Sequence, residues 1–97
     1  MRVVSKKTIV ACFIKHADAK DALEEWYTKA KKSEWASFDD VKQTFNSVDS
    51  IGNDRYVFNI KGNQYRLVGL ILFNRKIIFI RFVGPHKEYD KIDCSKI

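Results

Sequence analysis

Three side chains suited to acid–base chemistry lie close together near the end of the chain. His86, Tyr89 and Asp90 are spaced at i, i+3 and i+4, which places them on one face of a helical turn. Gly84-Pro85 precedes them, and proline is well tolerated at the start of a helix. The spacing therefore predicts a turn that presents an imidazole, the side chain that exchanges protons near neutral pH. A plainer interpretation is a capping network with Tyr89 half-buried and Asp90 paired to Lys87.

Cationic side chains are concentrated around this turn. Between Arg55 and Lys91 there are eight Lys or Arg residues against two acidic residues, a net charge of +6, which equals the net charge of the whole chain. Such a concentration is typical of a polyanion-binding surface. On charge alone, a solvated basic exterior kept for solubility is an equally good interpretation.

A histidine beside several cations suits the cleavage of RNA by its own 2′-hydroxyl. This reaction needs a base for the hydroxyl, cations for the charge that grows on the phosphoryl oxygens, and an acid for the leaving 5′-oxygen. A positioned acid or base typically contributes about 10²–10⁴-fold. The reaction requires no metal ion, so no metal site and no cofactor are expected.

The pattern of period two after Tyr56 predicts the strands that must position these groups. Gly62-Asn63 suits a two-residue II′ hairpin turn, which would pair Ile60 with Tyr65, Asn59 with Arg66, and Phe58 with Leu67. A second turn at Asn74-Arg75 would pair Leu70 with Phe79, Val68 with Arg81, and Leu67 with Phe82. Cross-strand partners share a face of the sheet.

This register predicts two different faces. One face is apolar and needs to be covered by helices; it carries Tyr56, Phe58, Ile60, Tyr65, Leu67, Ile71, Ile78, Ile80 and Phe82. The other face is polar at one end, with Asn59, Lys61, Gln64, Arg66 and Arg81, and apolar at the other end, with Val68, Leu70, Leu72, Ile77 and Phe79. We expect the His86 turn to lean over the polar end. The apolar end would be an exposed patch unless something covers it.

Capping residues and apolar periodicity predict helices in the first half of the chain. A short strand at residues 1–4 is followed by a helix capped by Ser5. Asp18 and Asp21 resemble a capping box that opens a second helix, whose apolar stripe includes Trp26. A third short helix would run from Ser37 to Phe45, followed by a polar loop to Asp54.

The composition limits the class of protein. With 97 residues, of which 45% are hydrophobic, we expect one domain, residues 1–97, of α+β class. No apolar run approaches the roughly 20 residues of a membrane span and no signal peptide is recognisable, so the expected compartment is the cytoplasm. Cys12 and His16 could ligate zinc, but two ligands without a third are weak evidence.

Three segments carry a resemblance to a known family. SKKTIVACFIKHADAKDALEEWY, VFNIKGNQYRLV and IRFVGPHKEYDKID resemble the HigB toxins, the ribosome-dependent mRNA interferases of type II toxin–antitoxin systems in the RelE-like superfamily. The resemblance covers nearly the whole chain. It implies an N-terminal strand and two helices packed on an antiparallel sheet, with a short C-terminal turn. It also implies cleavage of mRNA on the ribosome and neutralisation by a HigA-like antitoxin, with operator DNA bound only through the antitoxin complex.

The resemblance also implies roles for individual residues. The phosphate-binding cations of the superfamily correspond to Lys61 and Arg66, and the terminal aromatic residue corresponds to Tyr89. We predict His86 as the proton-transfer group, Tyr89 as an orienting or stacking residue, and Lys61, Arg66 and Arg81 as electrostatic stabilisers. The further RNA-binding candidates are Asn59, Gln64, Lys87 and Asp90. Which group is the base and which the acid stays open.

Two other classes of function compete with this one. A noncatalytic module could bind RNA or DNA with the same basic face. An interaction protein could instead use the apolar end of the sheet, and its binding would then be insensitive to salt.

Overall fold

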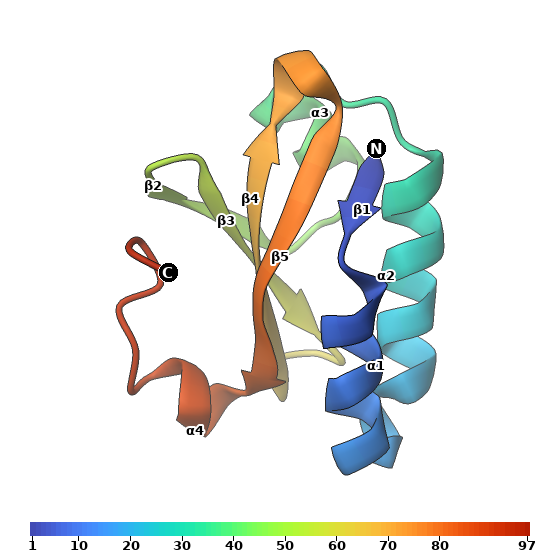
Figure 1. Ribbon diagram of the computed structural model, residues 1–97, viewed down its shortest axis with the longest axis vertical. Coiled ribbons are helices and arrows are strands. Elements are labelled where there is room, and N and C mark those ends of the chain that lie inside the picture. The colour runs from blue at the N-terminus through green and yellow to red at the C-terminus, as the bar shows by residue number, and fades with distance from the viewer.

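A five-stranded sheet forms the centre of the structure, a computed structural model that describes residues 1–97 (Figure 1). The strands lie in the order β1-β5-β4-β3-β2. Their bounds are Arg2–Val4 for β1, Val48–Gly52 for β2, Arg55–Ile60 for β3, Tyr65–Leu72 for β4 and Ile77–Pro85 for β5. All neighbouring strands are antiparallel except β1 and β5, which are parallel. The predicted α+β class is confirmed.

Two long helices cover one face of this sheet, as Figure 1 shows. They are α1 (Lys6–Lys15) and α2 (Lys20–Lys32), joined by the 3₁₀ turn η1 (Ala17–Ala19), and the shorter α3 (Phe38–Thr44) follows. The core between helices and sheet includes Ile9, Leu23, Trp26, Phe58, Leu67 and Ile78. No helix is long and apolar enough to cross a bilayer.

One predicted helix cap is confirmed and another is wrong. The Lys7 amide donates to Ser5 Oγ at 3.1 Å, so Ser5 caps α1. Asp18 does not open α2, which begins at Lys20 without a side-chain cap. Asp18 lies in η1 instead, where its carboxylate accepts hydrogen bonds from Tyr65 and Lys61. These partners come from the distant β3–β4 hairpin, so the local pattern could not reveal them.

The register of the first hairpin is confirmed at every predicted pair. Ile60 lies opposite Tyr65, Asn59 opposite Arg66, and Phe58 opposite Leu67. The Gln64 amide donates to the Lys61 carbonyl at 3.3 Å and closes the turn.

The register of the second hairpin is correct at one end and wrong at the other. Leu70 lies opposite Phe79 as predicted, but Val68 lies opposite Phe82 rather than Arg81, and Leu67 opposite Val83 rather than Phe82. The cause is a β-bulge after Ile80, which faces Gly69. A Cβ on Gly69 would lie 2.5 Å from Ile78 Cδ1, so the tight packing here requires glycine. The bulge moves Phe82 out of the predicted core face and leaves Arg81 exposed.

A strand lies where we expected only a loop. Val48–Gly52 forms β2 and pairs with β3 at the edge of the sheet. Only Val48 in this strand is buried, which explains why its apolar pattern was too weak to predict it.

The C-terminal segment covers the second face of the sheet. α4 (His86–Tyr89) follows β5 directly and forms the predicted helical turn. Residues 90–97, which we call the C-terminal strap, then run back beside β2 and β3 (Figure 1). Cys94 of the strap packs on Val57 and Val68, so part of the predicted exposed apolar end is covered by the chain itself.

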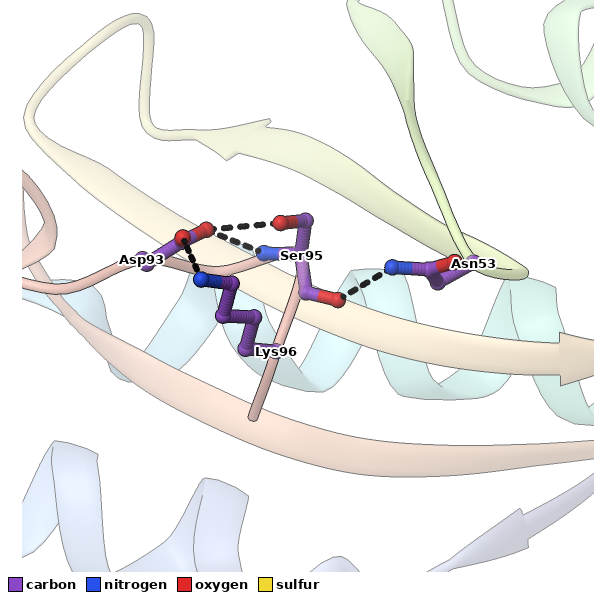
Figure 2. A network of polar contacts seen from close by, with 4 residues as sticks. All are labelled: Asn53, Asp93, Ser95 and Lys96. Atoms are coloured by element: carbon purple, nitrogen blue, oxygen red, sulfur yellow. Dashed lines mark hydrogen bonds and ion pairs between the residues drawn. The ribbon is translucent and has the colours of Figure 1, made fainter.

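Hydrogen bonds fasten the strap to the β2–β3 turn. Figure 2 shows Asn53 Nδ2 donating to the Ser95 carbonyl at 3.0 Å, and the Asp93 carboxylate accepting from the Ser95 amide and hydroxyl at 3.2 and 2.7 Å. Arg55 Nε donates to the Ile97 carbonyl at 2.7 Å.

Candidate active site

Arg66 and Tyr89 form the centre of the candidate site. The guanidinium carbon of Arg66 lies 5.2 Å from the centre of the Tyr89 ring, within the range of a cation–π interaction. Arg66 projects from β4 and Tyr89 from α4, so the contact joins the sheet to the terminal turn. The Arg66 Nε atom is buried without a protein partner. The site therefore holds a fixed positive charge on the face of the sheet that the long helices do not cover.

His86 and Asp90 form a pair on the same turn. His86 Nδ1 lies 2.9 Å from Asp90 Oδ2, and the two side chains are each roughly half exposed. When Nδ1 donates to this carboxylate, the proton-accepting nitrogen of a neutral imidazole is Nε2. The His86 amide also donates to the Gln64 carbonyl at 3.1 Å, which ties the turn to the first hairpin.

The Tyr89 phenol is held in its neutral form. Burial raises the pKa of Tyr89, and the neighbouring Cys94 raises it further, while the positive charge of Arg66 opposes the rise. The ring of Phe82 lies 6.3 Å from that of Tyr89, and the His86 ring lies 6.4 Å away. The bulge that turned Phe82 to this face therefore supplies one of the packing partners of Tyr89. At neutral pH this phenol is a hydrogen-bond donor and not a base.

Strands β2 and β3 border the site on the other side of Arg66. Asn59 is the direct cross-strand partner of Arg66, and its Nδ2 donates to Ser47 Oγ. The Asp49 carboxylate of β2 is near enough to raise the pKa of Tyr89. Sequence reasoning missed Asp49, because it placed this residue of β2 in a loop. It also missed Ser47, which does lie in a loop but meets Asn59 only through tertiary contact.

Two predicted cations lie apart from this centre. Lys61 Nζ is paired with Asp18 Oδ2 at 3.1 Å, which directs it toward η1 in the helical layer. Arg81 is exposed on the bulge, and no hydrogen bond, ion pair or ring contact links it to His86 or Arg66. The structure thus brings Arg66, Tyr89, His86 and Asp90 together, with Asn59 beside Arg66. Gln64 and Lys87 are exposed on the hairpin turn and on α4.

A pocket opens between α4 and the strap. It has a volume of about 390 Å³ and is lined by Ile51, Tyr89, Asp90, Ile92, Asp93, Cys94 and Ser95. The pocket is lined by Tyr89 and Asp90 of the candidate site together with residues of the strap, so it offers space beside the charged centre.

Comparison with protein families identifies the family to which the chain belongs. Residues 19–92 match the family model described as HigB_toxin, RelE-like toxic component of a toxin-antitoxin system. The chain belongs to the HigB toxin family. Both motif segments of the candidate site, the first hairpin and the His86 turn, lie within the matched residues.

Similar proteins cover almost the whole chain. An mRNA interferase HigB of Escherichia coli O6:H1 (strain CFT073) is 28% identical over 94 residues, which span 95% of this chain and 91% of that protein. The mRNA interferase toxin HigB of E. coli strain K12 and the mRNA interferase HigB of Shigella flexneri are each 29% identical over 92 residues, 93% of this chain and 88% of theirs. Membership of the HigB family confirms the sequence-based resemblance and implies an antitoxin partner.

Proposed function

We propose that this chain is an endoribonuclease that cleaves mRNA on the translating ribosome and is neutralised by a HigA antitoxin. The observation that carries the proposal is the convergence of the Arg66 guanidinium, the Tyr89 ring and the His86–Asp90 pair at the end of the sheet. It is supported by the name mRNA interferase of the HigB relatives.

In this proposal the chemistry needs no metal ion. His86 Nε2 exchanges the proton of the 2′-hydroxyl while Asp90 holds the imidazole through Nδ1. The 2′-oxygen then forms a bond to phosphorus, and the bond from phosphorus to the 5′-oxygen breaks. The leaving oxygen takes a proton from the protonated imidazole or from a water molecule, which gives a 2′,3′-cyclic phosphate and a 5′-hydroxyl.

The remaining candidates stabilise charge and position the RNA. Arg66 offers its free N–H groups to the phosphoryl oxygens, on which negative charge grows. Tyr89 fixes Arg66 from one side and donates a hydrogen bond or stacks on a base. Arg81 and Lys61 act at longer range, since neither contacts the centre, and Asn59, Gln64 and Lys87 hold the strand at the rim.

Expression of the chain without antitoxin tests this function. We expect growth arrest, and primer extension on cellular mRNA should reveal new 5′ ends in phase with codons. His86→Ala and Arg66→Ala should each lower cleavage by about 10²-fold or more and restore growth. Arg75→Ala is the matched control, because it removes an exposed cation in η2 (Phe73–Arg75) at the opposite end of the sheet from α4.

Two results would contradict the proposal. Full toxicity of both His86→Ala and Arg66→Ala would remove these residues from the site. Growth arrest or RNA binding without new 5′ ends would favour the alternative, a noncatalytic RNA- or DNA-binding module.

A further inference from the structure

The outer face of α1 is an apolar surface that nothing in the structure covers. Ile14 is 76% exposed, against 38% for Ile92, the other large exposed hydrophobic residue. Helical spacing places Ala11 and Lys7 on the same side as Ile14, with Val10 beside them. The inner face of α1, with Ile9, Cys12 and Phe13, packs on the core. Helix α1 is therefore apolar on both faces, whereas burial in the core requires only one.

The charges on this helix all have one sign. Helix α1 contains Lys6, Lys7 and Lys15 and no acidic residue. The Lys6 ammonium lies 4.8 Å from the centre of the Tyr27 ring of α2, and is therefore directed away from the outer face. Lys7 and Lys15 remain exposed at the two ends of the apolar strip. We call Lys7, Val10, Ala11, Ile14 and Lys15 the α1 surface.

A cleft borders the α1 surface along one side. Its volume is about 210 Å³. One wall is formed by α1 and its C-cap, with Thr8, Ala11, Cys12, Lys15 and His16, and the other by Val83, Gly84, Pro85 and Glu88. Ala11 and Lys15 belong both to the α1 surface and to the cleft. The exposed strip and the cleft thus form one continuous surface, with Ala11 and Ile14 at its centre, lysines at its two ends and the carboxylate of Glu88 on the far wall of the cleft.

We propose that the α1 surface and its cleft bind the antitoxin, through an amphipathic segment with an apolar side chain in the middle and carboxylates at both ends. Charge complementarity selects this occupant, because the carboxylates meet Lys7 and Lys15 while the apolar side chain covers Ile14. The inference rests on the antitoxin partner implied by the family and is independent of the RNA-cleaving chemistry.

Two other occupants fit this surface less well. A second copy of the chain would bring the lysines of both α1 surfaces close together, and like charges repel. RNA phosphates would suit Lys7 and Lys15 but would leave the exposed Ile14 without an apolar partner. Both alternatives are outcomes of the experiment below.

Calorimetric binding of the purified antitoxin, cloned from the gene that neighbours this one, tests the proposal. Ile14→Asp should weaken binding by about 30-fold or more, since central apolar contacts dominate interfaces. Lys7→Glu combined with Lys15→Glu should weaken it by about 10-fold and reduce its dependence on salt. Gln43→Glu is the control, because it adds the same carboxylate at an exposed position of α3, at the other end of the molecule (Figure 1).

Mutant toxicity supplies the second measurement. Because Ile14 is exposed and lies outside the candidate active site, Ile14→Asp should keep its melting temperature and its mRNA cleavage but escape neutralisation by the antitoxin in cells. Binding of Ile14→Asp within about twofold of the original chain would overturn the proposal. It would also be overturned if the original chain bound no antitoxin, if Ile14→Asp abolished self-association instead, or if the lysine variants lost only ribosome binding. Since cleavage is measured on the same variants, failure of this inference is distinguishable from failure of the proposed function.

Discussion

Arg66 owes its position to its neighbours on both strands. Asn59 lies on one side of it and Gly84 on the other in the register of the sheet. A Cβ at Gly84 would lie 2.9 Å from Phe82 Cζ, so the Phe82 ring, which also packs near Tyr89, requires glycine at this position.

Tyr65 and Asp18 connect the first hairpin to the helical layer. The Tyr65 hydroxyl donates to Asp18 Oδ1 at 2.6 Å; the residue is only 6% exposed, and its hydroxyl meets the carboxylate at the surface. The hydrogen bond to Asp18, followed by burial, raises the pKa of Tyr65 to about 12. The same hydrogen bond, together with that from Lys61, lowers the pKa of Asp18.

These shifts predict how the stability of the fold depends on pH. A carboxyl group whose pKa is lowered in the folded state stabilises the fold above its unfolded pKa, and this contribution is lost as the pH falls through the folded pKa. Tyr65→Phe removes the largest cause of the shift in Asp18. We therefore expect the loss of stability between about pH 7 and about pH 2 to be smaller in Tyr65→Phe than in the original chain.

Urea unfolding at each pH measures this difference. Tyr27→Phe is the control, since Tyr27 is half-buried and makes no side-chain hydrogen bond to a carboxylate. Equal acid losses for all three proteins would show that the Tyr65–Asp18 bond contributes nothing to the pH dependence.

The two hairpins show what a sequence pattern can predict about strands. Gly62-Asn63 marks the first turn, and the register follows from it by counting, so Asn59 and Arg66 were correctly paired. The bulge in β5 could not be predicted in this way, because Ile78, Ile80 and Phe82 alternate as in a regular strand. At the bulge Gly69 packs closely against Ile78, a contact between strands that sequence spacing does not contain.

In the candidate site too, local spacing was predictable from the sequence and tertiary contacts were not. His86, Tyr89 and Asp90 share one turn, and their spacing was enough to predict that they lie together. The positions of Lys61 and Arg81 depend on Asp18 and on the bulge, which are tertiary features. The strap was not predicted, because its packing on the sheet comes from two separate residues, Cys94 and Ile97, which form no periodic apolar pattern.

The hydrogen bonds of the strap predict the reactivity of that cysteine. Cys94 is 5% exposed at the wall of the pocket, so opening of the strap should increase the access of a reagent to its thiol. Asn53→Ala combined with Arg55→Ala removes the bonds to Ser95 and Ile97. At about 1 kcal/mol for each bond, we expect labelling of the Cys94 thiol to accelerate by about 10-fold or more.

Mass spectrometry of labelled peptides measures both thiols in one sample. Cys12 is the internal control, because it is buried on the inner face of α1 in the main core and is far from the strap in sequence. Its rate should not change. Equal acceleration of both cysteines would indicate general destabilisation, and no acceleration of Cys94 would show that the two side chains do not hold the strap.

Charge is distributed unevenly over the whole molecule. The net charge of +6 comes from residues 55–91, which include β3, β4, β5 and α4. If this segment binds RNA through phosphates, affinity should fall steeply as salt rises. Using His86→Ala to prevent cleavage, we expect Lys87→Ala to reduce the slope of log affinity against log salt by about one, as measured by fluorescence anisotropy.

The measurement of the salt dependence needs a control cation outside residues 55–91. Lys42→Ala in α3 removes an exposed charge there, and its slope should equal that of the parent. If affinity did not depend on salt, phosphate contacts would not be the basis of binding, and an apolar interaction surface would be favoured.

The parallel pairing of β1 with β5 also affects how the molecule is made. β1 has no other strand neighbour. It can therefore pair with the sheet only after Ile77 to Phe79 of β5 have been synthesised. At about 5–20 residues per second, synthesis of the intervening segment takes roughly 4–15 seconds. Throughout this interval the sheet is unfinished and α4 has not been made. Each newly made molecule therefore acquires its candidate centre only once α4 has been synthesised, later than every other helix and strand of the fold.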